Sequence, residues 1–147
     1  MPSKHKRERS KKVSHSIPTP RRARAILRNL PHEQGFCFYE AVDKPTGQVT
    51  TNLLEFCDRL ASAESLQART SLAFHARRGD FATWIREAVG DSELADKIGK
   101  VDPSSPRLAK RLHKTVDTRI KQLRRALREY AVFPEDKQIT LSAQRTR

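Results

Sequence analysis

Apolar side chains recur every three or four residues through the middle of the chain, and this spacing is typical of amphipathic helices. Short helices are predicted over residues 20–30, 52–63, 66–78, 81–89 and 92–101. Residues that favour helix ends separate them. The predicted N-caps are Thr19, Asn52, Asp80 and Asp91, and the predicted stops are Pro31, Gly79 and Gly90. Closely spaced caps and stops indicate a compact bundle of short helices.

Residues 35–42 break the helical pattern. Phe36, Phe38 and Glu40 alternate there with Cys37, Tyr39 and Ala41, and a turn-like sequence follows at residues 43–47. Alternation with a period of two is typical of a strand. The segment is predicted to be either a strand or a short extended stretch held by its aromatic side chains.

The last predicted helix is the longest. Ser105 is a plausible N-cap and Pro106 a plausible first residue, and no further proline follows until Pro134. The helix can therefore run for about 26 residues, or about 39 Å at 1.5 Å per residue. Its apolar and basic residues fall on opposite sides at 100° per residue. The apolar side holds Leu108, Leu112, Val116, Ile120, Leu123 and Leu127, and the basic side holds Lys110, Lys114, Lys121, Arg124, Arg125 and Arg128.

Charge divides the 147 residues into three parts. Residues 1–32 carry ten Lys and Arg against one acid, residues 33–106 carry eight against twelve, and residues 107–147 carry twelve against four. The net charge of the whole chain is +13. Basic segments on both sides of a mildly acidic domain favour a polyanionic partner.

The chain lacks the common catalytic and metal-binding motifs. It contains no P-loop, GxGxxG or GxSxG sequence, so no motif indicates nucleotide hydrolysis or serine-hydrolase chemistry. Cys37 and Cys57 match neither a redox pair nor a zinc pair, and both are predicted to be buried, reduced thiols. No histidine has a His or Cys three or four residues further on. No metal site and no cofactor are therefore predicted.

One polar cluster allows two interpretations. His75 and Asp80 are suited to an acid–base pair, with Arg77 or Arg78 holding an anion. The same residues are explained by structure alone, with His75 near the C-terminus of one helix and Asp80 capping the next. The structural interpretation is favoured because no second carboxylate or nucleophile joins the group.

Several motifs between Phe36 and about Val101 give the chain a recognisable pattern. The most specific are the FHxxRGDFxxWI motif at residues 74–85 and the GDSELA motif at residues 90–95. With these motifs the segment resembles a family of small archaeal and bacterial proteins classed as a domain of unknown function. The resemblance implies a small, mostly helical domain without an established activity. The basic residues 1–32 and the strongly basic final helix lie outside the resembling pattern.

The expected organisation is mostly α. A disordered basic arm over residues 1–17 precedes a single helical domain over residues 18–133, and a polar tail follows over residues 134–147. Within the domain, the family-like part covers residues 36–101 and the long basic helix residues 106–131. No apolar run is long enough to span a bilayer and no signal peptide is recognisable, so a cytoplasmic protein without membrane contact is expected.

The leading hypothesis is a non-enzymatic protein that binds the phosphate backbone of RNA or DNA with weak sequence preference. Its setting would be a ribonucleoprotein, such as the ribosome, or the nucleoid. The alternative is a helical protein-interaction or regulatory module. The expected nucleic-acid contacts are Lys4, Lys6, Arg7, Arg9, Lys11, Lys12, Arg21, Arg22, Arg24, Arg28, Lys110, Lys114, Lys121, Arg124, Arg125 and Arg128.

Overall fold

The computed structural model describes residues 18–132 and divides the chain into two compact units. The larger unit comprises residues 25–120, and the described part of the smaller unit comprises residues 18–24 and 121–132. Most of the described residues are helical, as the sequence predicts. The elements in chain order are α2 (Pro20–Ile26), η2 (His32–Gln34), β1 (Phe36–Ala41), β2 (Lys44–Thr50), α3 (Leu53–Ala61), α4 (Leu66–Arg78), α5 (Asp80–Trp84), η3 (Ile85–Val89), α6 (Ser92–Gly99) and α7 (Leu108–Val132). None of the described helices is both long and apolar enough to cross a membrane.

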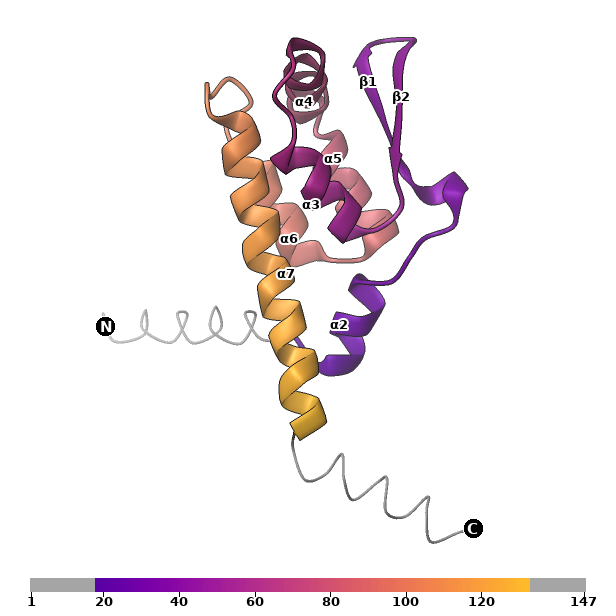
Figure 1. The fold of residues 1–147 in the computed structure, drawn as a ribbon, viewed down its shortest axis with the longest axis vertical. Helices are drawn as coiled ribbons and strands as arrows, with labels where there is room; N and C mark the ends of the chain where they lie inside the picture. The colour runs from indigo at the N-terminus through magenta and orange to yellow at the C-terminus, as the bar shows by residue number, and fades with distance from the viewer. Residues whose placement is uncertain (1–17, 133–147) are drawn as a thin grey trace, which may run out of the picture. The chain divides into compact units, whose positions relative to one another are not determined.

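The predicted extended segment is a strand, and it has a partner. β1 pairs antiparallel with β2, with Phe36 opposite Thr50 and Cys37 opposite Val49. Residues 44–47, predicted as part of a turn, therefore belong to β2, and the chain turns at Val42 and Asp43, where Asp43 has a φ of 60°. The hairpin lies beside α4 (Figure 1).

The alternation along β1 places aromatic side chains in the core and the cysteine outside. Phe36 and Phe38 are buried, whereas Cys37 is exposed. The prediction that Cys37 is buried is therefore wrong, because its side chain points to the opposite face of the strand from the two phenylalanines. Cys57, on α3, is buried as predicted, and neither cysteine forms a disulfide bond.

The core of the larger unit is an aromatic cluster. The ring of Phe36 lies 5.1 Å from that of Phe81 and 5.6 Å from that of Trp84, and Phe56 contacts both of these rings as well. The Trp84 indole N–H donates to the Gln34 carbonyl at 2.8 Å. This hydrogen bond satisfies the polar atom of an otherwise apolar side chain and fixes the chain just before β1.

The N-caps form largely as predicted. The side-chain oxygens of Thr19, Asn52 and Asp91 accept hydrogen bonds from backbone N–H groups three residues further on. Ser65 caps α4 in the same way. Gly79 ends α4 in the left-handed region, at a φ of 76°, which glycine adopts without the steric cost that a Cβ would add.

Asp80 departs from its predicted role as an N-cap. It is the first residue of α5, Gly79 is the cap residue, and no side chain caps that helix. The Asp80 carboxylate instead contacts His75. Because Gly79 is the single residue between α4 and α5, Asp80 lies next to the end of α4 and its carboxylate contacts that helix.

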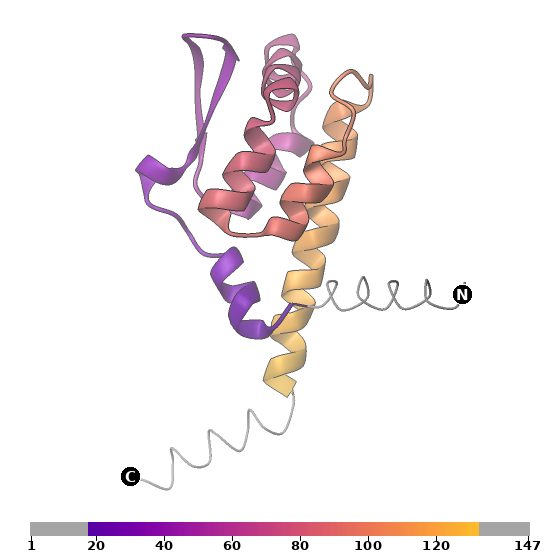
Figure 2. The same ribbon diagram turned by 180° about the vertical axis from the view of Figure 1, so that it is seen from behind.

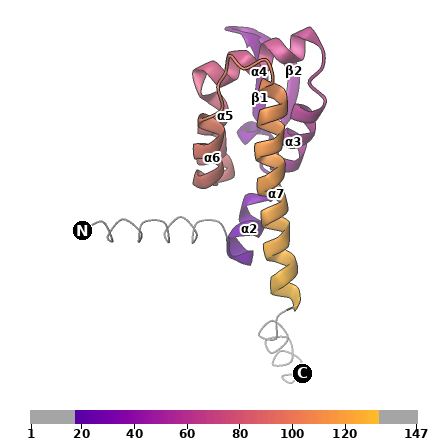
Figure 3. The same cartoon turned by 90° about the vertical axis from the view of Figure 1, so that its left-hand side faces the viewer.

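Several helix boundaries also differ from the sequence pattern. α2 ends at Ile26 rather than Leu30, and the Leu30 N–H donates to the Thr51 carbonyl instead. The predicted helix 81–89 consists of α5 and a π-helical turn, η3, which leads into α6 (Figure 2). α7 begins at Leu108 rather than at Pro106. Just before the helix, the Ser105 hydroxyl oxygen accepts a hydrogen bond from the Arg107 N–H. α5 and α6 contact each other along their length and overlap in the view of Figure 3.

Candidate functional site

The six basic residues predicted to share one side of α7 are all exposed. They are Lys110, Lys114, Lys121, Arg124, Arg125 and Arg128, and we call them the basic face of α7. On the other side of the helix Leu108, Leu112, Val116, Ile120 and Leu123 are buried, and Leu127 is half-buried. Burial of the apolar side fixes which side of α7 faces solvent. Arg125 pairs with Glu129 at 2.9 Å, so part of its charge is already balanced.

The arginines at and after α2 have different surroundings. Arg21, Arg22, Arg24 and Arg28 are all exposed by surface area. The Arg28 guanidinium nevertheless donates to the carbonyls of Ala88 and Val89, at the end of η3. Arg28 therefore holds a helix end of the larger unit. The expected contacts Lys4, Lys6, Arg7, Arg9, Lys11 and Lys12 lie outside the described residues.

The larger unit contains a basic groove of about 800 Å³, formed by α3, α4 and the segment that leads into α7. Arg69 and Arg77 line it from α4, Arg107 lines it from the residue before α7, and Lys110 from the first turn of α7. Glu64 is the one acid among the described residues that line it. Of these bases, the sequence analysis named Lys110 as a nucleic-acid contact and Arg77 only as a possible anion-holding residue beside His75 and Asp80. The two α4 arginines are eight residues apart, close to two helical turns, which is the one local signal that could have indicated them.

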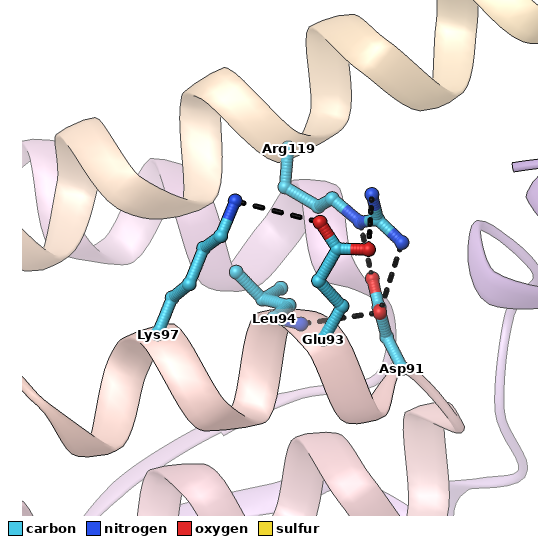
Figure 4. Close-up of polar contacts among 5 residues, drawn as sticks. All are labelled: Asp91, Glu93, Leu94, Lys97 and Arg119. Carbon is cyan, nitrogen blue, oxygen red and sulfur yellow. Dashed lines mark hydrogen bonds and ion pairs between the residues drawn. The ribbon is translucent and has the colours of Figure 1, made fainter. Parts of the chain in front are cut away.

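One further basic residue of α7 is not available to a ligand. Arg119 is 4% exposed and pairs with Asp91 at 2.7 Å and with Glu93 at 3.6 Å. Figure 4 shows this network, in which Lys97 also reaches Glu93. Asp91 thus caps α6 and binds α7 at the same time. The network positions the first half of α7, and with it Lys110 and Lys114, relative to α6.

The His75 cluster forms as a set of close contacts. The His75 Nδ1 lies 2.8 Å from an Asp80 carboxylate oxygen, and Arg78 Nε lies 3.2 Å from the same oxygen. On the other side of the ring, Nε2 accepts a hydrogen bond from the Tyr39 backbone N–H at 2.8 Å. Since Nε2 accepts, Nδ1 carries the proton and donates to Asp80. The contacts join α4, α5 and β1.

His75 lies at the edge of an open cleft of about 480 Å³, which Arg78 and Asp80 also line. Burial lowers the pKa of His75 below its ordinary value of 6.5, although the hydrogen bond that His75 donates to Asp80 opposes the shift. The imidazole is therefore neutral at physiological pH. Both ring nitrogens already have partners within the chain, so neither is free to exchange a proton with a substrate in this arrangement.

Comparison with known proteins places the chain in a family. Residues 33–144 match the model of DUF5752, a family of unknown function, and this region includes all of α7 as well as the motifs at residues 74–85 and 90–95. The match extends well beyond Val101, where the resemblance seen in the sequence ended, and leaves residues 1–32 outside. No curated protein and no solved structure matches the chain. The chain belongs to the DUF5752 family.

Proposed function

We propose that this protein is a non-enzymatic nucleic-acid-binding protein that contacts the phosphate backbone. The groove lined by Arg69, Arg77, Arg107 and Lys110 is the observation that carries the proposal. Four bases and a single acid around one concave surface create a positive potential, and a concave surface concentrates it. Phosphate groups are the ligands that arginine binds best, through two parallel hydrogen bonds.

The exposed basic residues of α7 continue the row of cations that could contact phosphates along the helix. Lys110 belongs both to the groove and to the basic face, and Lys114 follows one turn later. The repeated charges of a nucleic-acid backbone suit such a row of cations better than a single small anion does. The exposed arginines Arg21, Arg22 and Arg24 add further cations to the proposal.

The aromatic residues favour weak sequence preference. Phe36, Phe38, Phe56, Phe81 and Trp84 are all buried in the core. Tyr39 and Phe74 are half-buried. With its rings packed inside, the described part of the chain offers little surface on which bases could stack. Contacts to phosphate carry no sequence information, so RNA and DNA of many sequences should bind.

Two observations favour binding over the alternatives. An enzyme centred on His75 and Asp80 would need a free ring nitrogen, and both nitrogens have partners. An interaction module built on the apolar side of α7 would need that side exposed, and its residues from Leu108 to Leu123 are buried. The archaeal or bacterial origin, the cytoplasmic location and the ribosomal or nucleoid setting belong to the same proposal.

Affinity measurements on matched variants test the proposal. The groove variant carries Arg69→Ala, Arg77→Ala and Arg107→Ala. The control carries Lys44→Ala, Arg86→Ala and Lys100→Ala, three exposed bases outside the groove, so both variants lose the same charge. Fluorescence anisotropy with a duplex DNA and an RNA hairpin should show affinity about tenfold or more lower for the groove variant, and a smaller loss for the control. Equal losses in the two variants would contradict a role for the groove.

A further inference from the structure

Three side chains with metal-ligand chemistry converge inside the larger unit. They are Cys57 on α3 and His113 and Asp117 on α7. The Cys57 Sγ, a ring nitrogen of His113 and a carboxylate oxygen of Asp117 all lie within 4.8 Å of one another. Cys57 is buried and the other two side chains are half-buried. The residues come from two helices, and more than fifty positions of sequence separate Cys57 from His113.

We propose that Cys57, His113 and Asp117 form a Zn²⁺ site with a water molecule as the fourth ligand. Thiolate, imidazole and carboxylate are the three ligand types that zinc uses in proteins. Tetrahedral bonds of about 2.0 to 2.3 Å place ligand atoms about 3.3 to 3.6 Å apart. The observed separations, 4.8 Å at most, need side-chain adjustments of about 1 Å.

The helical spacing of two ligands favours this geometry. His113 and Asp117 are four residues apart on α7, so their side chains lie one turn apart on the same side of the helix. Cys57 faces them from α3. An ion held by all three would bind the first half of α7 to α3. The proposal does not depend on nucleic-acid binding.

The donor set selects among metal ions. A thiolate sulfur and an imidazole nitrogen favour zinc or another transition metal over Mg²⁺ and Ca²⁺, which prefer oxygen ligands. The half-buried His113 also lines the basic groove, so one ligand of the cluster is open to solvent there.

The same three residue types could also suggest a cysteine nucleophile with a His–Asp pair. Burial argues against that interpretation, because the Cys57 side chain is 6% exposed and a substrate carbonyl could not approach its sulfur. A metal ion is small enough to reach it. The arrangement is therefore better suited to holding an ion than to attacking a substrate.

Metal titration of the full chain tests the site. Protein purified with a chelator and a reducing agent is loaded with Co²⁺, which reports thiolate coordination by a near-ultraviolet charge-transfer band and tetrahedral geometry by its visible bands. Zn²⁺ bound per chain is measured in parallel by elemental analysis. The variants are Cys57→Ser, His113→Ala and Asp117→Asn, and the control is Cys37→Ser, which removes the exposed thiol outside the cluster.

We expect one bound Zn²⁺ per chain. With Co²⁺, the wild type and Cys37→Ser should both show the charge-transfer band, and Cys57→Ser should lose it. His113→Ala and Asp117→Asn should weaken Zn²⁺ binding by about tenfold or more, and Zn²⁺ should raise the melting temperature of the wild type. Mg²⁺ should neither bind at this site nor raise the melting temperature. Since Asp117 is half-buried, Asp117→Asn keeps the test available if Cys57→Ser fails to fold. Absence of bound metal in the wild type, or loss of the band in Cys37→Ser alone, would overturn the proposal.

Discussion

The Arg119 guanidinium donates two hydrogen bonds to the Asp91 carboxylate, from Nε at 2.7 Å and from Nη2 at 3.1 Å. Both side chains are buried, with exposures of 4% and 1%. The same carboxylate accepts the Leu94 N–H at the start of α6. The Asp91 carboxylate therefore caps the N-terminus of α6 and pairs with a buried cation of α7. This pair holds α7 against α6.

Loss of one member of this pair should be costly. Asp91→Ala leaves a buried guanidinium without its main partner and removes the α6 cap, so we expect a loss of about 3 to 5 kcal/mol in the free energy of unfolding. Urea denaturation at neutral pH measures it. The matched control is Asp96→Ala, which breaks the more exposed pair between Arg86 and Asp96 and should cost about 1 kcal/mol or less. Equal costs would show that the buried pair has no special role.

The His75 contacts predict a pH dependence of stability. Burial lowers the pKa of His75 in the folded protein below the 6.5 of the unfolded chain, so the unfolded state binds the proton more readily. The stabilisation is complete above pH 6.5 and is lost as pH falls from 6.5 towards the folded pKa. Melting temperatures measured from pH 7.5 to pH 5 should therefore fall more steeply for the wild type than for His75→Gln.

Glutamine can donate to Asp80 and accept from Tyr39, but it does not titrate. His75→Gln should accordingly keep nucleic-acid affinity within a few fold of the wild type. His32→Gln, at an exposed histidine, serves as the control and should retain the wild-type pH dependence. If His32→Gln flattened the pH profile and His75→Gln did not, the assignment to His75 would be wrong.

Substitution of Gly79 should lower stability because its backbone is left-handed, and not because an added side chain would clash with its surroundings. Its φ is +76°, and apart from its chain neighbours no atom lies within 4 Å of the position that a Cβ would occupy. We expect Gly79→Ala to lower the free energy of unfolding by about 1 to 2 kcal/mol, the cost of a left-handed alanine. Gly99→Ala is the control, since this helical glycine has room for a Cβ 3.9 Å from that of Ala82. It should be neutral or slightly stabilising. Chemical denaturation of both variants measures the contrast.

The sequence predicted the features that depend on near neighbours. The caps at Thr19, Asn52 and Asp91 and the stops at Gly79 and Gly90 follow from interactions within a few residues, and all of them form. The opposed apolar and basic sides of α7 follow from helical periodicity alone, and the burial along α7 confirms them.

Features that depend on distant partners could not be predicted in the same way. The buried pair of Asp91 and Arg119 joins residues 28 positions apart. In the sequence, Asp91 can be recognised only as the N-cap of the helix that follows it. The groove forms only where α4 and the start of α7 come together, so a shared site for Arg69, Arg77 and Arg107 could not be predicted from the sequence. Asp80 is a different case, because its partner His75 is only five residues away and the sequence analysis had already considered the two as a pair; the structure shows that contact in place of the predicted cap.

The salt dependence of affinity tests the central proposal most directly. A protein that neutralises about five phosphates should show a slope near −4 for log affinity against log salt concentration on duplex DNA, at about −0.9 per phosphate. Lys110→Ala, Lys114→Ala and Arg124→Ala together, on the exposed face of α7, should reduce the magnitude of that slope by about 2 to 3 while the melting temperature stays near that of the wild type. A scrambled duplex should give the same slope. A wild-type protein that binds neither RNA nor DNA, or that binds with no dependence on salt, would contradict the account.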